Sequence, residues 1–232
     1  MNKLFLLAAM VLSLTACNKY KIEGVSSVSS LDGRMLFIKV WQNDLMITVD
    51  SCEIIHGKFT MQGKVDSVVM ATLYMDDQPV MPLVIEKGNI KIAIDDLKLT
   101  ASGTVLNDKL SSFIDQQKSI SSRAEDLSHK ESQMIMDGKG PAEVQEMVHT
   151  EGEKLSNEMN KLIKEFITGN YENVLGTGIF MILCSNMPYP MMTPQIEEIL
   201  DKAPDSFKNH PFIKEFVSAA EENMRRMKYG RQ

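Results

Sequence analysis

Hydrophobic and polar residues alternate with a period of two through most of the segment from residue 20 to residue 103. This alternation indicates strands that cover a core with one face and leave the other face in water. Residues that share a face under this pattern are Leu36, Ile38 and Val40; Phe59, Met61 and Val65; Ile90, Ile92 and Ile94; and Leu97, Leu99 and Ala101.

Short polar breaks separate these alternating runs. They contain glycine, asparagine and aspartate, which tolerate the left-handed backbone of tight turns and therefore predict hairpins. The breaks are Asp32-Gly33, Asn43-Asp44, His56-Gly57, Asp76-Asp77, Lys87-Gly88 and Asp95-Asp96. About seven to eight short strands at this spacing predict an antiparallel β-sandwich or an open barrel.

The period becomes helical at Asn107, which we interpret as an N-cap. The first apolar stripe consists of Leu110, Phe113, Ile114, Gln117, Ile120, Ala124, Leu127, Met134 and Ile135. Gly138-Lys139-Gly140 then breaks the pattern, and Pro141 suits the first turn of a second long helix. Two long amphipathic helices joined by such a turn predict an antiparallel helical hairpin.

Three further helices are expected after Gly169-Asn170. They are an apolar helix over residues 174–184, a short helix that begins at Thr193-Pro194, and a last helix that begins at His210-Pro211. Gly176 and Gly178 in the apolar helix indicate close packing, because a dinucleotide fingerprint would need a preceding strand and a third glycine. The fold class is therefore α+β, with a β-rich domain at residues 17–106 and a helical domain of about five helices at residues 107–232.

The first sixteen residues have the pattern of a signal peptide. Lys3 supplies a positive start, residues 4–14 form an apolar run, and Leu14-Thr15-Ala16-Cys17 closes the segment. Small residues before the cut are typical of signal peptidase sites. A cysteine directly after the cut predicts a bacterial lipoprotein in which Cys17 carries the lipid, since two or three acyl chains hold a protein firmly on a membrane.

Charge and hydropathy exclude several other classes. The chain carries a formal net charge of −6, and removal of residues 1–16 with Lys3 leaves 24 basic and 31 acidic residues, or −7. An acidic chain without a basic cluster argues against nucleic-acid binding. No later apolar run approaches the ~20 residues of a transmembrane helix. The expected link to the membrane is the lipid alone.

Few residues suggest catalytic or metal chemistry. Cys52 and Cys184 are expected to be buried unpaired thiols, with a disulfide as the alternative, and the chain has no Cys-x-x-Cys pair. The four histidines lack metal-site spacing, and the 18 methionines fall mostly at core positions, which leaves methionine-based copper handling as a weak alternative. We expect no metal, no cofactor and no catalytic residue.

One short motif predicts a modification. Asp66-Ser67-Val68 resembles the Asp-Ser/Thr-aliphatic acceptor for O-glycosylation in the envelope of Bacteroidetes-type bacteria. The motif stands where a strand begins, a position from which a bulky sugar on Ser67 could face water.

Four segments together resemble a known family. They are residues 20–24 (Tyr-Lys-Ile-Glu-Gly), 50–63 (Asp-Ser-Cys-Glu-Ile-Ile-His-Gly-Lys-Phe-Thr-Met-Gln-Gly), 84–92 (Val-Ile-Glu-Lys-Gly-Asn-Ile-Lys-Ile) and 102–107 (Ser-Gly-Thr-Val-Leu-Asn). They are similar to the β-rich domain of unknown function that forms the N-terminal module of thiol–disulfide oxidoreductase lipoproteins in Bacteroidetes. The resemblance covers residues 20–107 well and the helical part loosely.

The resemblance implies a protein that works alongside thiol–disulfide exchange but does not carry it out. In fuller members of the family a helical segment leads into a thioredoxin-fold module with a Cys-x-x-Cys pair, and this sequence ends at Gln232, about where that module would begin. We therefore expect a non-enzymatic binding or accessory lipoprotein, linked to a separate thioredoxin-like envelope partner. Asn18 after the lipidated cysteine favours the outer membrane, facing the periplasm. The alternative is an enzyme or ligand-binding protein with a site between the two modules.

Overall fold

The computed structural model describes residues 18–42, 45–96 and 98–229. The signal segment 1–16, the lipidation residue Cys17 and the predicted turn at Asn43-Asp44 lie outside the described residues. The chain divides into two compact units, residues 1–107 and residues 108–232, which we call the β unit and the helical unit. The fold class is α+β, as the sequence predicted.

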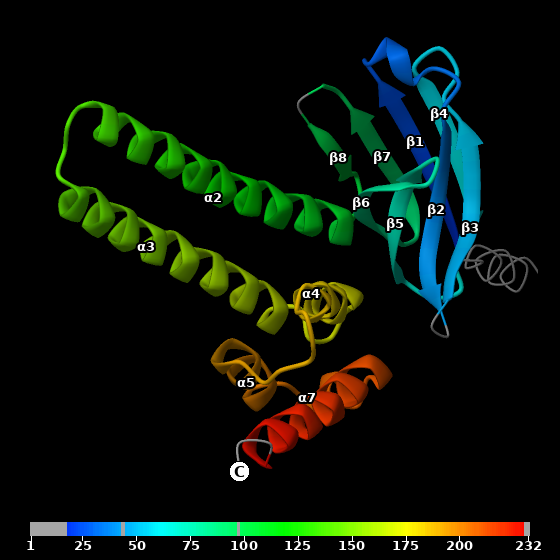
Figure 1. Cartoon of the computed structure of the whole chain (residues 1–232). Coiled ribbons are helices and arrows are strands. Elements are labelled where there is room, and N and C mark those ends of the chain that lie inside the picture. Colours follow the sequence, from blue (N-terminus) through cyan, green and yellow to red (C-terminus); the bar gives the residue numbers. More distant parts are fainter. Residues whose placement is uncertain (1–17, 43–44, 97, 230–232) are drawn as a thin grey trace, which may run out of the picture. The chain divides into compact units, whose positions relative to one another are not determined.

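The β unit consists of two four-stranded sheets. One sheet has the order β4-β1-β7-β8 and the other the order β3-β2-β5-β6. The strands are β1 (Lys19–Ser26), β2 (Met35–Gln42), β3 (Leu45–Glu53), β4 (Lys58–Lys64), β5 (Val69–Met75), β6 (Gln78–Ile85), β7 (Gly88–Ile94) and β8 (Leu99–Ser102), with a short 3-10 helix η1 (Ser29–Leu31) after β1. The sheets remain separate, which selects the sandwich over the open barrel (Figure 1).

The inner faces of both sheets form one hydrophobic core. Leu36 and Ile38 of β2 are fully buried, together with Ile90 of β7. Their neighbours in sequence face outward, so the predicted alternation of β2 and β7 is confirmed. Because seven strands bury residues in the same cluster and the half-buried Cys52 of β3 packs against it, neither sheet buries its apolar face without the other.

Strand pairing differs from the expectation in several places, because the predicted hairpins at Asp32-Gly33, His56-Gly57 and Lys87-Gly88 instead connect strands of different sheets. Five of the six strand pairs are antiparallel, but β1 pairs with β7 in parallel, with Ile22 opposite Ile90. The turn at Lys87-Gly88, which we expected to close a hairpin, instead carries the chain from β6 in one sheet to β7 in the other. Neighbouring strands in sequence need not pair when the connection crosses a sandwich.

The turn at His56-Gly57 is tight, but it joins the two sheets and does not close the hairpin that was predicted there. His56 and Gly57 both have positive φ, at 52° and 70°, and Ile55 bridges Lys58 across them. β3 therefore enters this turn from one sheet and β4 leaves it in the other. The backbone N–H of Ser26 donates to the Gly57 carbonyl at 2.7 Å, which holds the turn against the end of β1.

Two aromatic rings cover glycines between β1 and β4. Phe59 lies opposite Gly24, and an added Cβ at Gly24 would fall 1.9 Å from the Phe59 ring. Tyr20 lies opposite Gly63 in the same way, with the nearest ring atom 2.7 Å from such a Cβ. Packing between these two strands thus explains Tyr20, Gly24, Phe59 and Gly63, whereas Gly57 serves the turn.

Asn107 does not act as the N-cap that the sequence suggested. The helix α2 (Val105–Met136) begins two residues earlier, and Asn107 is fully buried within its first turn. Its side-chain Nδ2 donates to the Val84 carbonyl at 2.8 Å, and its Oδ1 accepts from the Val84 N–H at 2.9 Å. Since β6 is an edge strand, this amide occupies the place of a neighbouring strand at Val84.

Six helices follow the strands among the described residues. The first of them, α2, begins within the last three residues of the β unit. The six helices are α2, α3 (Pro141–Thr168), α4 (Val174–Ser185), α5 (Pro194–Asp201), α6 (Asp205–Lys208) and α7 (Pro211–Tyr229). Pro141 stands in the first turn of α3, and the Thr193 hydroxyl accepts from the Ile196 N–H at 3.3 Å as the cap of α5. Both helix starts agree with the sequence prediction.

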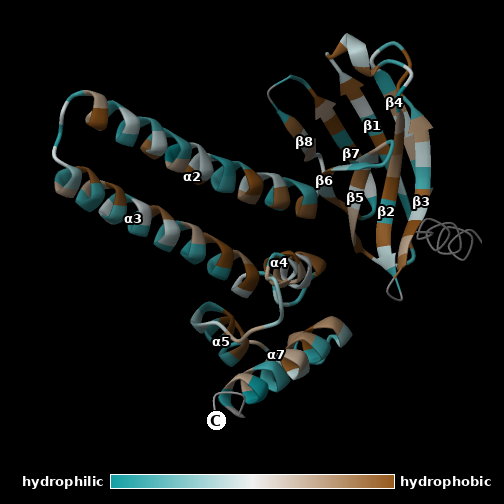
Figure 2. Cartoon of the chain, viewed as in Figure 1, coloured by the Kyte–Doolittle hydropathy of each residue, from teal (hydrophilic) through white to brown (hydrophobic). Residues whose placement is uncertain are grey.

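The long helices α2 and α3 form the expected pair (Figures 1 and 2). Phe113 of α2 stacks on Phe166 of α3 with ring centroids 4.2 Å apart, and Arg123 pairs with Glu158 at 2.8 Å. The apolar stripe is buried for a shorter distance than predicted, because Ile135 is exposed near the end of α2. Two helices alone offer too little cover for a stripe of that length.

None of the described helices is both long enough and apolar enough to cross a membrane.

Candidate functional site

Both described cysteines are unsuited to nucleophilic chemistry. Cys52 is half-buried in β3, and burial raises the pKa of its thiol to about 11, with the Asp50 carboxylate as a second cause. Cys184 is buried at the end of α4, where burial raises its pKa to about 12. Both are free thiols, and they belong to different units. At neutral pH each is almost entirely protonated.

We therefore expect no thiol–disulfide exchange by the soluble Cys17→Ser protein. Exchange requires an accessible thiolate near a resolving thiol. Insulin reduction should show no turnover, and alkylation of both thiols should be slow in the folded protein and rapid in urea. Turnover that disappears in Cys52→Ala or in Cys184→Ala would contradict this prediction.

The other residues selected from the sequence lie on the surface of their units. Ser67 is exposed in the bend between β4 and β5, so it is accessible to a modifying enzyme. His56, His129 and His149 are also exposed or nearly so. Among the described residues, no group of three or more His, Cys, Asp or Glu side chains is placed to hold a metal ion.

His210, which precedes α7, is the one partly buried histidine of the four. Its Nδ1 atom is buried and has no hydrogen-bond partner among the described residues. Burial lowers the pKa of this histidine below its usual value. The imidazole is therefore neutral at pH 7, since an unpaired buried charge would be costly.

A concave surface lies on the helical unit, between α5, α6 and α7. It is a groove of about 750 Å³ with an apolar floor. The floor is made by Met192 before α5, Leu200 of α5, and Ile213 and Val217 of α7. A volume of this size is typical of a binding site for a small molecule or for part of a peptide.

Charged side chains of both signs surround this floor. Glu197, Glu198 and Asp201 line the α5 side, whereas Lys208, Lys214 and Glu221 line the side of α6 and α7. Ser218 is the only hydroxyl among the described lining residues, and no histidine or cysteine accompanies it. The lining therefore combines an apolar floor with ionic groups of both signs, which suits the binding of an apolar group that carries charged neighbours.

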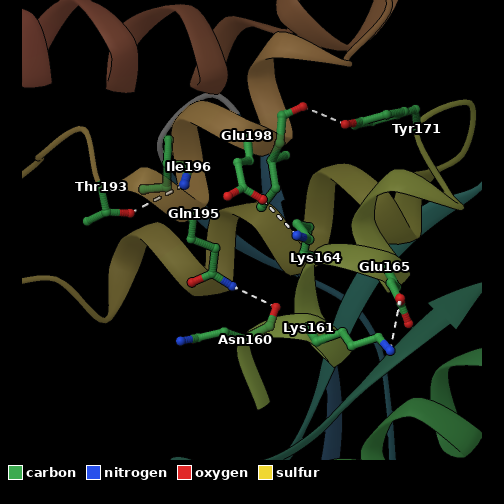
Figure 3. A network of polar contacts seen from close by, with 10 residues as sticks. Asn160, Lys161, Lys164, Glu165, Tyr171, Thr193, Gln195, Ile196 and Glu198 are labelled. Atoms are coloured by element: carbon green, nitrogen blue, oxygen red, sulfur yellow. Dashed lines mark hydrogen bonds and ion pairs between the residues drawn. The ribbon is translucent and has the colours of Figure 1, made fainter. Parts of the chain in front are cut away.

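Polar contacts hold α5 against α3, and so fix one wall of the groove (Figure 3). Lys164 of α3 pairs with Glu198 at 2.7 Å, and this hydrogen bond lowers the pKa of the Glu198 carboxyl. Gln195 Nε2 donates to the Asn160 carbonyl at 3.1 Å. The Tyr171 hydroxyl donates to the carbonyl of Ile199, at the far end of the same helix.

Buried aromatic side chains hold α6 and α7, which form the other wall of the groove, against α4. Phe207 of α6 makes edge contacts with Tyr171 and Phe180, at centroid distances of 4.8 and 5.6 Å. Phe180 of α4 also contacts Phe216 of α7, at 6.0 Å. The buried aromatic group ties α4, α6 and α7 together, so the groove is preformed in the fold.

Close backbone packing before α4 completes this support. Gly176 lies against the turn after α3, where an added Cβ would fall 2.3 Å from the Asn170 carbonyl oxygen. The Asn170 side chain is buried and donates to the Phe166 carbonyl at 2.8 Å. The interpretation of Gly176 as a close-packing residue is confirmed.

Sequence reasoning did not find the groove. It predicted a last helix that begins at His210-Pro211 but missed the four-residue helix α6 before it. One signal was present: the apolar residues of α7 span more than one face, since Phe216 is buried in the core while Val217 is only half-buried. When the apolar surface of a helix is too wide for one packing contact, it indicates a second contact surface on that helix.

Comparison with known proteins finds a match for the β unit and for the first residues of the helical unit. Residues 20–110 match the model of a family described as "Domain of unknown function (DUF4369)". No curated protein and no solved structure matches the chain. The matched residues include all eight strands and the first turn of α2 with Asn107, but they leave out the groove. This part of the chain is therefore similar to a domain family whose function is unknown.

Proposed function

We propose that this protein is a lipoprotein of the bacterial envelope that acts as a non-enzymatic binding or accessory module. The lipid anchor is Cys17, at the end of a signal peptide with the cleavage pattern Leu14-Thr15-Ala16-Cys17. Dual or triple acylation would hold the mature chain on its membrane without a spanning helix. We place it on the outer membrane, facing the periplasm.

The observation that carries the binding role is the groove between α5, α6 and α7. Its apolar floor can take a hydrophobic side chain, and its rim offers four carboxylates and two lysines to polar groups around that anchor. The walls are already held in place by Lys164–Glu198 and by the aromatic contacts of Phe180. A preformed groove loses little entropy on binding.

The partner we propose is a thioredoxin-fold protein of the same compartment. The support is the resemblance of residues 20–107 to the N-terminal module of thiol–disulfide oxidoreductase lipoproteins. The protonated state of Cys52 and Cys184 supports a division of labour in which the partner supplies the thiol chemistry.

A photocrosslinking amino acid at Ser218 tests the groove in cells. We expect an adduct with an envelope protein from Ser218, and none of the same size from Met224, which is exposed on α7 outside the groove. Val217→Glu should abolish the Ser218 adduct, because it places a charge on the apolar floor, whereas Met224→Glu should leave it unchanged. An adduct that survives Val217→Glu, or none from Ser218, would contradict a binding role of the groove.

A further inference from the structure

The turn end of β2 and β3 carries large apolar side chains on both of its faces. Trp41 and Leu45 are 53% and 66% exposed, and Met46 and Ile47 are exposed as well. We call these four residues the apolar tip. Trp41 pairs with Met46 on one face, while Ile47 pairs with the inward-facing Val40 on the other. Both faces of the tip therefore remain partly exposed to solvent.

The apolar tip lies at the same end of the β unit as the first described residue, Asn18. The turn at Gly57 joins the end of β3 to the start of β4, so the start of β3 and the end of β4 lie together at the opposite end. Lys64 at the end of β4 pairs with Lys19, and the Val65 N–H donates to the Asn18 carbonyl at 3.0 Å. In Figure 1 this is the lower end of the sandwich.

Only one peptide bond separates Asn18 from Cys17. Consecutive Cα atoms are about 3.8 Å apart, so an acylated Cys17 leaves no linker between the bilayer and the β unit. The end of the sandwich that holds Asn18 must then lie at the lipid surface. The apolar tip shares that end, as do the exposed lysines Lys19 and Lys64, which suit lipid headgroups.

We infer that the apolar tip is a second membrane contact, in which Trp41, Leu45, Met46 and Ile47 enter the interfacial layer of the bilayer beside the lipid on Cys17. This inference rests on the proposed lipid anchor. A bilayer can surround both faces of the tip at once, whereas an added protein strand would pair along the β3 edge and leave side chains on both faces exposed. Tryptophan is also favoured at the membrane interface. With two contacts the β unit has one orientation on the membrane.

Trp41 is the only tryptophan in the chain, so its fluorescence reports on the tip directly. The acylated full chain is reconstituted in phosphatidylethanolamine–phosphatidylglycerol vesicles, with and without brominated acyl chains. We expect blue-shifted Trp41 emission, relative to the Cys17→Ser protein in buffer, and strong quenching by the brominated lipids. Unshifted and unquenched emission from acylated protein in vesicles would overturn the inference.

Two matched variants test which residues make the contact. Leu45→Glu should reduce the quenching, because it adds a charge to the tip. Ile55→Glu should not, because Ile55 is as exposed as the tip residues but lies at the turn of the opposite end. Equal loss in both variants would overturn the inference. A blue shift of the Cys17→Ser protein that grows with concentration without vesicles would also overturn it, in favour of a second copy.

The failure of the anchor is distinguishable from the failure of the tip. If Cys17 carries no acyl chain, the proposed anchor fails. Residues 17–232 are then coupled through Cys17 to a maleimide lipid, a reaction that the raised pKa values of Cys52 and Cys184 direct to Cys17. Quenching of Trp41 in the coupled protein supports the tip contact, and its absence overturns it.

Discussion

Replacement of Asn107 by alanine should lower the free energy of unfolding of the β unit by about 3 kcal/mol, since each buried polar group left unpaired costs about 1–3 kcal/mol. The Asn107 side chain pairs with both backbone groups of Val84 and also donates to the Thr104 hydroxyl at 2.8 Å. Val84 is fully buried, so water cannot replace these bonds without opening the edge of β6. Urea unfolding followed by hydrogen exchange of the buried strand amides measures the change within this unit.

Asn89→Ala is the matched control for that measurement. Asn89 also makes a side-chain hydrogen bond, to Glu23 at 2.8 Å, but it is exposed at the start of β7. We expect a change within about 0.5 kcal/mol, because water replaces the lost bond. Equal effects of the two substitutions would show that the bonds of Asn107 do not close the edge of β6.

Replacement of Gly176 by alanine should destabilise the helical unit by about 2–3 kcal/mol, in the range of other overpacking substitutions. The added methyl group would meet the backbone of Asn170 and Tyr171, and backbone cannot rotate away as a flexible side chain can. The turn after α3 would have to move, and with it Tyr171, which holds α5. Thermal unfolding followed by helical circular dichroism measures the loss.

Gly152→Ala provides the opposite expectation from the same chemical change. Gly152 lies inside α3, and an added Cβ there meets no atom within 4 Å. Alanine should therefore stabilise the helix by up to about 1 kcal/mol, since it is the better helix former. A neutral effect of Gly176→Ala would contradict the close packing before α4.

Local patterns predicted the elements well. The alternation at Leu36, Ile38 and Val40 follows from the pleat of a strand, which depends on neighbouring residues alone. The starts of α3 at Pro141 and of α5 after Thr193 are likewise local, because capping chemistry acts within one turn. The number and spacing of such elements predicted a sandwich or an open barrel, and the two separate sheets select the sandwich.

The features that sequence reasoning missed depend on contacts between distant residues. Asn107 has the appearance of a cap, but its partner Val84 lies 23 positions earlier, and no local pattern records that bond. The parallel pairing of β1 with β7 likewise joins distant segments. The groove is assembled from two short helices and one long helix, and one of the short helices has only four residues, so its floor has no periodic signature along the chain.

The central claim, a lipoprotein anchored at Cys17, is tested most directly by mass spectrometry of the N-terminal peptide of the protein from isolated membranes. The account predicts that this peptide begins at Cys17 and carries a diacylglyceryl group on the sulfur, with a further acyl chain on the new amine in bacteria that add one. It also predicts that Cys17→Ser protein leaves the membrane fraction. A membrane-bound chain that starts elsewhere, or one that starts at an unmodified Cys17, would contradict the account.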